Sequence, residues 1–489
     1  PCRMNNIEPT PEDRLPKEIT IVKGDGFTME GVKLLGSFIG TKDYCEKAAR
    51  KWIDTRVEPL LNKILKMKDT QAAMSLIHTS GLVNHMVYLQ RTTPTHLISE
   101  ALSHYAQLLR KALSVLASEN IAEDLWRIAG LPWKRGGLFM RDPSLHAPAA
   151  FLGSLLACRQ QVFNAWTGAQ TIFDKLLTDA VALFNSKLSS AVPSVNINSN
   201  SIFTQSELSA KIDDSVHDLI IKGSIGRRPV ALLLSQQTPH ASAWKHPIAE
   251  KSMDLVLRPD EFQMSIKTSL GCKVIPDGAC CPFCKEHPVL GPEGDHLSSC
   301  PDQGHVVHTH NAYRDKIIEF SRKAGITVMK EKLVKLKDGS TYRADISFPL
   351  GIPGYTTRHV LADVTFRNPF TKTAIKKSSK WSGAAAQMGE QDKERLLHDR
   401  LSESNYELIP IAVETLSGIG TECEPLINYI LTQLSYRLRK PFYEVAAFFW
   451  QSLSVLVQRL KMNRILYCLQ LLSNEPGPIK EEAAVNVNI

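Results

Sequence analysis

Four residues with the spacing of metal ligands place the strongest constraint on this chain. Cys281 and Cys284 form a short pair, eleven residues separate this pair from His296, and Cys300 follows after three more. Zn²⁺ takes four nitrogen or sulfur ligands in a tetrahedron, and two short-spaced pairs can close around it without a large core. We therefore expect a structural zinc site, because the protein would fill all four positions and leave none open for water.

The same stretch holds other potential ligands, so the spacing alone leaves the exact ligand set open. These surplus donors are Cys272, Cys280, His287, His305 and His308. The alternative to a zinc site is a cysteine-rich loop with ordinary buried thiols.

Ten cysteines in 489 residues are too sparse for a disulfide scaffold. The chain shows no signal peptide and no apolar run of about 18 residues. We expect an intracellular protein, nuclear or cytoplasmic, that does not associate with a membrane.

Length and charge set the context for these residues. The chain is long enough for two to four domains, and it begins with Pro1 rather than methionine, so we expect a fragment or a processed product. Residues 305–400 contain 18 lysines and arginines against 10 acids, a net charge of +8 that equals the charge of the whole chain. This segment includes Lys372, Lys376, Lys377 and Lys380, which favour a polyanionic partner. For any single lysine, a solvated loop is the alternative.

Apolar periodicity predicts a multidomain protein of the α plus α/β class. Residues 19–40 have the pattern of a β-hairpin, and helical spacing follows over 43–67, 70–87, 94–116 and 147–163. Thr93 and Pro94 would open the third of these helices as N-cap and first helical residue. Residues 189–201 are polar and lack periodicity, so we expect a linker there.

The pattern after the cysteine-rich segment changes to mixed helix and strand. It predicts a helix over 312–323, strands over 326–336, 342–348 and 359–366, a helix over 384–401 and a strand over 408–413. This order favours an α/β sandwich around a mixed sheet. Residues 425–472 are expected to be helical again, and 474–489 to form a polar tail.

Two acids on the predicted strands suggest chemistry. Asp345 and Asp363 each lie among apolar neighbours, and Glu331 lies on the preceding strand. Two such strands side by side would bring both carboxylates to one divalent cation. Mg²⁺ takes oxygen ligands and can activate water for attack on a phosphodiester. Taken singly, an aspartate at a strand end is more often a cap or turn residue.

These acids, with Lys393 on the following helix, resemble the PD-(D/E)XK restriction-like nuclease core. The variant is the one carried by the C-terminal endonuclease domain of non-LTR retrotransposon reverse transcriptase polyproteins. The segment 281–300 resembles the zinc knuckle before that core, 310–315 its His-Asn-rich helix, and 413–420 the segment after the lysine helix. Ala344 replaces the proline of the family name, and Thr365 replaces the lysine of the simplest motif. In the family variant the lysine can lie on the next helix, which gives this role to Lys393.

The front of the chain is similar to the region that follows the polymerase palm in such polyproteins. Residues 33–40 resemble the segment between palm and thumb, 91–94 lie in a thumb-like helical bundle, and 136–141 and 149–154 resemble the connector beyond it. Polymerases need paired aspartates on a hairpin, whereas the pair Asp213–Asp214 lies in a helical region. We expect the palm to be absent and this fragment to have no polymerase activity.

The resemblance implies six parts of the chain. These are a palm-to-thumb hairpin remnant (1–40), a helical thumb-like and connector region (41–165), a helical connector with the polar linker (166–270), the zinc knuckle (271–310), the restriction-like endonuclease domain (311–420), and C-terminal helices with a tail (421–489).

The implied activity is Mg²⁺-dependent hydrolysis of one strand of target DNA, whose 3′-hydroxyl would prime reverse transcription of the element RNA. Asp345 and Asp363 would hold the magnesium ion, Lys393 would assist, and Glu331 would support them. The residues expected to contact nucleic acid are Arg314, His310, Lys372, Lys376, Lys377 and Lys380. No small-molecule substrate is expected. The alternatives are a catalytically inactive nucleic-acid-binding module derived from such an element and a zinc-stabilised scaffold protein.

Overall fold

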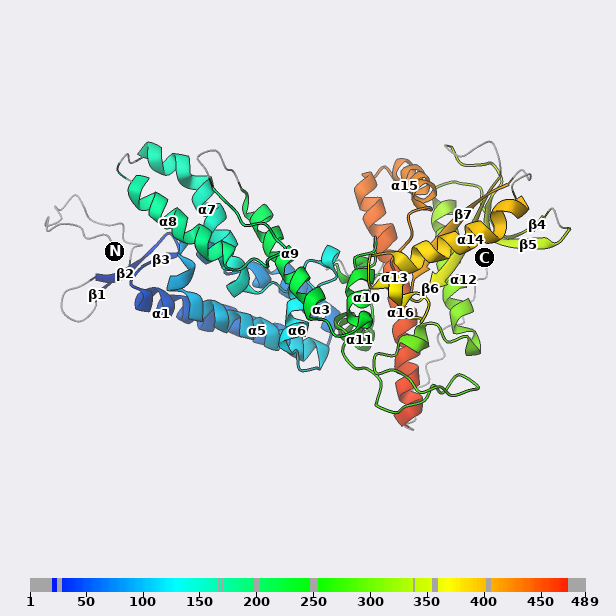
Figure 1. The fold of residues 1–489 in the computed structure, drawn as a ribbon, viewed down its shortest axis with the longest axis horizontal. Helices are drawn as coiled ribbons and strands as arrows, with labels where there is room; N and C mark the ends of the chain where they lie inside the picture. The colour runs from blue at the N-terminus through cyan, green and yellow to red at the C-terminus, as the bar shows by residue number, and fades with distance from the viewer. Residues whose placement is uncertain are drawn as a thin grey trace. The chain divides into compact units, whose positions relative to one another are not determined.

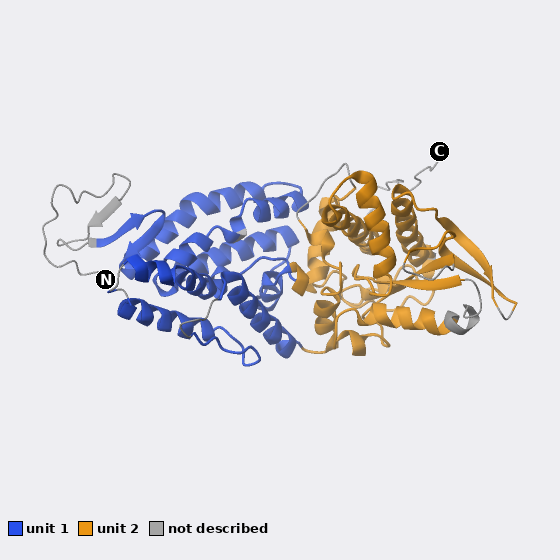
Figure 2. Cartoon of the chain, turned by 90° about the horizontal axis from the view of Figure 1, so that it is seen from above, with its two compact units in different colours: residues 1–132, 137–224 blue, residues 133–136, 225–489 orange. Residues whose placement is uncertain are grey.

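The chain forms two compact units in a computed structural model (Figure 1, Figure 2). The structure describes residues 20–23, 29–165, 168, 170–197, 203–246, 254–336, 339–353, 359–401 and 406–473. Unit 1 comprises residues 1–132 and 137–224, and unit 2 comprises 133–136 and 225–489. Helices predominate and two small sheets are present, which agrees with the predicted multidomain α and α/β class.

Unit 1 begins with a three-stranded antiparallel sheet in the order β1-β2-β3. The strands are β1 (Thr20–Lys23), β2 (Met29–Leu34) and β3 (Ser37–Gly40). The predicted hairpin is therefore present, and β3 extends it. Leu35 and Gly36 connect β2 to β3 with φ angles of 48° and 86°. Positive φ at both central residues is the geometry of a two-residue hairpin turn that matches the twist of the strands.

The rest of unit 1 is helical. Its helices are α1 (Lys42–Trp52), α2 (Glu58–Leu65), α3 (Thr70–Thr79), α4 (Val87–Thr92), α5 (Ser99–Ala117), α6 (Glu123–Gly130), α7 (Pro143–Ala165), α8 (Gln170–Asn185) and α9 (Gln205–Gly223). A π-helical turn at Ile53–Val57 joins α1 to α2, so these two follow the predicted helix over 43–67.

Two predicted helix boundaries in unit 1 are wrong. The helix expected over 70–87 ends at Thr79, because Gly81 takes a left-handed conformation with a φ of 74°. The helix expected to open at Pro94 begins only at Ser99, after a 3₁₀ turn at Thr95–Leu97. Proline fixes its own φ but does not choose between a 3₁₀ turn and an α-helix, so this signal misplaced the start.

The described part of the expected linker, residues 189–197, folds back onto α8. The Asn185 side chain donates to the Val195 carbonyl at 2.9 Å and accepts from the Val195 amide at 2.8 Å. Val195 is buried. This segment therefore does not mark the division between the two units, which lies at residues 224–225 instead. Residues 198–201 lie outside the described part of the chain.

Unit 2 contains a four-stranded mixed sheet in the order β4-β5-β6-β7. The strands are β4 (Met329–Lys335), β5 (Thr341–Phe348), β6 (His359–Arg367) and β7 (Tyr406–Glu414). The first three pair antiparallel, and β7 lies parallel to β6. The predicted order of helix, three strands, helix and strand is confirmed, and so is the mixed sheet.

The helices of unit 2 are α10 (Arg227–Ser235), α11 (Pro259–Leu270), α12 (His305–Lys323), α13 (Ile375–Ser378), α14 (Ala384–Leu401), α15 (Glu424–Leu438) and α16 (Phe442–Ser473). α12 begins at His305, seven residues before the predicted start, and takes in residues 305–310 that we assigned to the knuckle. The helix predicted over 425–472 is two helices, because Arg439 has a φ of 52° and Pro441 follows it. The expected tail 474–489 lies outside the described residues.

Helices cover both faces of the sheet. α12, α15 and α16 share one core with alternating residues of β6 and β7, such as Val364 and Ile411. α14 lies on the opposite face, where Gly389 is in close contact with the side chains of Thr365 and Ala412. A Cβ atom at Gly389 would lie 3.1 Å from Thr365 Cγ2, so glycine lets this helix approach the sheet closely. The strands are thus sandwiched as the sequence pattern predicts.

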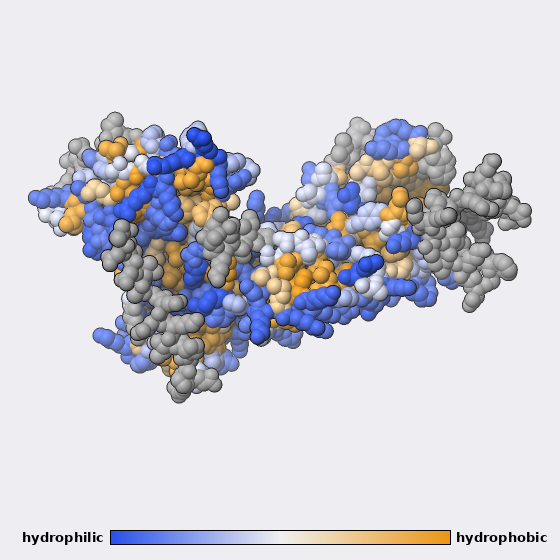
Figure 3. Space-filling model, turned by 180° about the vertical axis from the view of Figure 1, so that it is seen from behind, coloured by the Kyte–Doolittle hydropathy of each residue, from blue (hydrophilic) through white to orange (hydrophobic). Residues whose placement is uncertain are grey.

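The surface of each unit is mixed in character. On the face shown in Figure 3, hydrophilic residues separate the hydrophobic ones into distinct patches. Among the described residues, none of the helices combines the length and the apolar character needed to cross a bilayer.

Candidate metal centre and carboxylate site

The four predicted zinc ligands come together in unit 2. Atoms of Cys281, Cys284, His296 and Cys300 that could bind a metal all lie within 4.8 Å of one another. Cys284 Sγ is 3.1 Å from His296 Nε2 and 3.2 Å from Cys300 Sγ. The three cysteines are buried and none forms a disulfide. This Cys₃His set, called the Cys/His site below, could bind zinc.

Local backbone pairing explains why these residues converge. Cys280 bridges to Val289 in an antiparallel manner, and the Cys281 amide donates to the Pro288 carbonyl at 2.9 Å. This small hairpin presents the first two cysteines. Gly294, with a φ of 70°, then starts the 3₁₀ turn Asp295–Ser298 that carries His296.

The surplus donors do not join the four ligands. His287 instead places Nδ1 2.9 Å from the Cys281 carbonyl oxygen. His305 and His308 lie in the first turn of α12. Cys272 and Cys280 also stand outside the group. The structure thus selects one set among the alternatives that the spacing left open.

The Cys/His site is built into a larger core. Its cysteines pack with Phe283, Leu290 and Leu297 and with Met462 and Ile465 of α16. Arg464 of α16 lies 3.3 Å from the centre of the Phe283 ring and donates from Nη2 to Cys300 Sγ at 3.7 Å. Burial and the neighbouring thiols Cys300 and Cys281 raise the pKa of Cys284 to about 12. Ionisation of the Cys284 thiol would therefore need a nearby cation, a condition that zinc meets.

The two predicted catalytic aspartates lie opposite each other where two strands separate. β5 and β6 pair only through three residues, ending with Ile346 opposite Ala362. The next position in this register is Asp345 opposite Asp363, and the Asp345 amide donates to Asp363 Oδ1 at 3.4 Å. Beyond this point β5 pairs only with β4, and β6 pairs only with β7. The carboxylates thus occupy the fork in the sheet.

His310 of α12 enters this fork. Its Nε2 lies 2.9 Å from Asp345 Oδ2 and 3.1 Å from the Val364 carbonyl oxygen. Both neighbours are acceptors, so this nitrogen carries the proton. The Val364 amide also donates to Asp345 Oδ2, at 2.8 Å. We expected His310 to contact nucleic acid, and the structure places it in the carboxylate site.

Lys393 of α14 reaches the same place from the opposite side. Its ammonium forms an ion pair with Asp363 Oδ2. The Asp363 side chain is only 4% exposed. Three residues that lie far apart in the sequence, Asp345, Asp363 and Lys393, are therefore brought together with His310.

The two carboxylates differ in acidity. Burial and the charge of Asp345 raise the pKa of Asp363, and the ammonium of Lys393 opposes this only in part. Burial is the largest influence on Asp345 and acts to raise its pKa, but the hydrogen bond and charge of His310, together with the hydrogen bond from the Val364 amide, outweigh it and leave this pKa lowered. That same bond raises the pKa of His310. The site thus contains one carboxylate that accepts from an imidazole and a second carboxylate that is held by an ammonium.

Glu331 lies in the same row of the sheet as the two aspartates. The pairs on either side of it, Lys330 with Ile346 and Lys332 with Ala344, put it opposite Asp345. Its φ of 57° interrupts the ladder at this point. A positive φ is uncommon for a residue with a side chain and marks a locally constrained backbone.

Arg314 binds the side chain of Glu331. Its Nη1 donates to Glu331 Oε1 at 2.8 Å and its Nε donates to Asp315 Oδ1 at 2.9 Å. The Arg314 side chain is 3% exposed. We predicted that Arg314 contacts phosphates. This does not fit its burial, because its guanidinium already donates to Asp315 and Glu331 within the protein.

The four predicted phosphate-binding lysines lie in and around α13. Lys372, Lys376, Lys377 and Lys380 are all exposed. Trp381, which follows them, is 43% exposed. Within the part of the chain that the structure describes, no acid pairs with any of the four, so their charge faces solvent.

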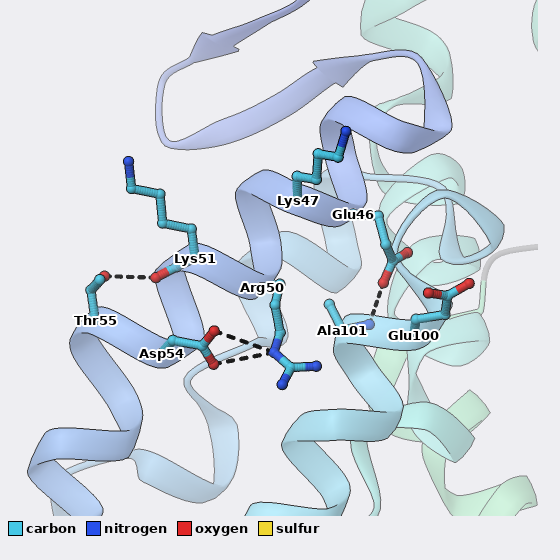
Figure 4. Close-up of a pocket in the computed structure, with 8 residues that line it drawn as sticks. All are labelled: Glu46, Lys47, Arg50, Lys51, Asp54, Thr55, Glu100 and Ala101. Atoms are coloured by element: carbon cyan, nitrogen blue, oxygen red, sulfur yellow. Dashed lines mark hydrogen bonds and ion pairs between the residues drawn. The ribbon is translucent and has the colours of Figure 1, made fainter.

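Unit 1 contains a separate charged hollow of about 550 Å³ between α1 and α5 (Figure 4). Arg50 donates from Nε to both oxygens of Asp54, at 3.2 and 3.3 Å. Glu46 accepts from the Ala101 amide. Asp54, Glu58 and His104 also bring potential ligand atoms within 4.8 Å of one another. Because Arg50 already balances the exposed Asp54, this group does not require a cation.

Several contributors to the two sites were not predicted. Arg464 and the Val364 amide contact them from positions that no local motif marks. The one available signal was a charged residue among the apolar positions of α16, since a buried arginine needs a partner.

Similarity to known proteins does not decide what this site does. A scan against models of known protein families and a search of curated proteins find no match for this chain.

Proposed function

We propose that unit 2 is a metal-dependent DNA endonuclease and that the chain is the C-terminal part of a non-LTR retrotransposon reverse transcriptase polyprotein. The observation that supports the activity best is the convergence of Asp345, Asp363 and Lys393 at the fork between β5 and β6. The sequence resemblance supports the wider identity, because it covers the Cys/His segment, the α12 region and the sheet in the same order.

The residues present fit a divalent cation in their chemistry. Asp345 and Asp363 offer carboxylate oxygens from adjacent strands, which are the ligands that Mg²⁺ prefers. Their mutual repulsion, expressed in the raised pKa of Asp363, is what a cation between them would relieve. When bound, Mg²⁺ would polarise a phosphoryl oxygen and make a bound water acidic enough to act as a nucleophile.

The surrounding side chains have distinct roles in this proposal. His310 and the Val364 amide both hold Asp345 Oδ2, so they fix the orientation of this carboxylate. Because its Nε2 is committed to Asp345, His310 is a positioning residue. Lys393 supplies a positive charge beside Asp363 that can stabilise charge developing on a phosphate.

The exposed lysines around α13 would hold the DNA backbone. Lysines that neutralise phosphates give binding that weakens with salt and carries no sequence information. Cleavage of one strand would leave a 3′-hydroxyl for reverse transcription of the element RNA, with zinc stabilising the Cys/His site and magnesium serving catalysis.

The proposal is tested by separating cleavage from binding. Asp363→Asn and Lys393→Met should lower Mg²⁺-dependent nicking of supercoiled plasmid by roughly a hundredfold or more, while DNA affinity without divalent metal stays near that of the wild type. Lys376→Ala with Lys377→Ala should weaken binding and flatten its salt dependence by roughly one unit of slope per lost phosphate contact.

A matched control lies on the same helix as Lys393. Asp392 pairs with Arg367 at 2.7 Å and is not part of the carboxylate site. Asp392→Asn should therefore nick as the wild type does. Normal nicking by Asp363→Asn, or no nicking by the wild type with Mg²⁺ or Mn²⁺, would refute the nuclease proposal.

A second candidate is a nucleic-acid-binding module without catalysis. The observation in its favour is that His310 and Lys393 already bind the carboxylates of Asp345 and Asp363 within the protein. It predicts salt-sensitive DNA binding in a wild-type protein that does not nick.

A further inference from the structure

A small cavity of about 20 Å³ lies within unit 2, between the Cys/His site and the sheet. Apart from two valines, the residues that line it are Ser298, His305, Thr309, Phe366, Thr415 and Lys461. They come from the 3₁₀ turn of the Cys/His site, from α12, from the end of β6, from the segment after β7 and from α16. A space of this size holds about one water-sized atom.

Two hydroxyl groups of the lining have no hydrogen-bond partner. The Oγ1 atoms of Thr309 and Thr415 are both buried and unpaired. Thr415 as a whole is only 6% exposed. Buried hydroxyls in folded proteins are almost always paired with protein or with a bound molecule. Two orphans around one cavity therefore indicate a bound group there.

Lys461 adds a charge to this lining. No carboxylate lies within ion-pair distance of its ammonium in the described part of the chain. Burial lowers its pKa to about 8, while the more distant Asp295 raises it and Arg228 lowers it. At neutral pH the side chain is therefore mainly protonated. An ammonium can only donate hydrogen bonds.

No acid lines the cavity. The ammonium of Lys461 and the unpaired hydroxyls of Thr309 and Thr415 therefore all favour a negatively charged ligand atom that accepts hydrogen bonds. We propose that the cavity is a subsite for one non-bridging oxygen of a nucleic-acid backbone phosphate, held by Lys461, Thr309 and Thr415. A phosphate oxygen is negative, accepts several hydrogen bonds and has the size of the space. The remaining atoms of the phosphate would stay outside.

The choice of a nucleic acid rests on the proposed function and on the position of the cavity. Thr309 directly precedes His310 on α12, and Phe366 lies three residues beyond Asp363 on β6. Three strand residues span roughly 10 Å. A phosphate in the cavity would thus belong to a nucleotide near the one at the carboxylate site. Free inorganic phosphate has the same chemistry and must be distinguished experimentally.

The first test uses inorganic phosphate as the probe. The melting temperature of the full chain is compared in phosphate and in chloride at equal ionic strength. Phosphate should raise it for the wild type and leave it unchanged for Lys461→Met and for Thr415→Val, which each remove one contact at nearly constant volume. Lys440→Met, which removes the same charge from an exposed position, should keep the phosphate effect.

The second test uses duplex DNA in the absence of divalent metal. Lys461→Met should weaken binding by roughly tenfold, as expected for a lost hydrogen bond to a charged group, and should lower the salt slope by roughly one unit. Thr415→Val should also weaken DNA binding. If Lys461→Met does not fold, the proposal is tested with Thr415→Val alone.

The results separate the subsite from the nuclease. A phosphate effect that all variants share, or that the wild type lacks, means that the cavity holds only a water and overturns the proposal. Loss of the phosphate effect with unchanged DNA affinity means that the ligand is free phosphate, which also overturns it. If the cavity variants lose both the phosphate effect and DNA affinity while the wild type fails to nick DNA, the subsite is supported and the nuclease proposal is refuted.

Discussion

Arg464 shows how a single residue can set the properties of the Cys/His site. Three thiolates and a neutral imidazole around Zn²⁺ leave a net charge of about −1. Arg464 donates to Cys300 Sγ at 3.7 Å and to the Asp302 carbonyl at 3.3 Å, and it is itself 7% exposed. A buried cation that donates to a thiolate offsets this charge and fixes the sulfur in place.

We predict that Arg464→Leu lowers the affinity for zinc by roughly ten- to a hundredfold, the usual effect of losing a partner of a metal ligand. Competition with a chromophoric chelator measures it. Arg459→Leu is the matched control, because Arg459 lies on the same helix but contacts Asp254 and the Val256 carbonyl. Cys284→Ser should instead reduce bound zinc by about one ion per chain. Equal zinc affinities of the Arg464 and Arg459 variants would show that the Arg464 guanidinium contributes only packing and does not stabilise the bound metal.

α14 is held in place by a buried carboxylate at its first turn. Glu414, at the end of β7, accepts from the amides of Ala385 and Ala386 at 3.1 and 3.4 Å. Thr238 donates to its other oxygen at 3.3 Å. The N-terminus of a helix favours negative charge. The position of Lys393 therefore depends on an anchor two turns before it on the same helix.

Burial raises the pKa of Glu414 to about 7, despite the hydrogen bonds that lower it. Because this value exceeds the ordinary 4.5, the folded protein binds more protons than the unfolded chain between these values. Stability should therefore fall as the pH rises through this window. The expected loss is on the order of 3 kcal/mol between about pH 5 and about pH 8.

Urea denaturation of the wild type and of Glu414→Gln at the two pH values measures this. The stability advantage of the wild type should shrink as the pH rises, since glutamine does not titrate. Glu422→Gln, which removes a charge from an exposed position nearby, corrects for the change in net charge. A difference between wild type and Glu414→Gln that is independent of pH would contradict the assignment.

The elements of unit 2 could be predicted to a large extent because their signals are local. Strand alternation and helical spacing gave the order from α12 to β7, and ligand spacing gave the Cys/His set. The contact of His310 with Asp345 could not be predicted, since it depends on how α12 packs on the sheet. The same holds for Glu331, whose positive φ no local motif marks and whose side chain accepts from Arg314 of α12.

At the scale of the whole molecule, the two units have separate cores and should unfold separately. The Cys/His site and its hydrophobic cluster belong to unit 2 alone. Structural zinc contributes its binding free energy to folding. Metal removal should therefore act on one unit only.

We predict two calorimetric unfolding transitions, one for each unit. A zinc chelator should lower the midpoint temperature of the unit 2 transition by roughly 10 °C or more. Limited proteolysis in chelator should cut within 225–473 and spare the described part of 29–224. The chelator should have no further effect on Cys284→Ser. A parallel shift of both transitions would mean that the units are energetically coupled.

The long helix α16 has a consequence for how the protein is made. Its first half, with Phe449 and Leu453, completes the core under the sheet, and its second half, with Met462 and Ile465, completes the core around the Cys/His site. A ribosome adds roughly 5–20 residues per second, so the four ligands emerge roughly 10 to 35 s before the end of α16. During this interval the thiols of the nascent chain are open to oxidation and to competing metals, so the zinc that we predict for this site would have to be supplied at the ribosome for unit 2 to mature.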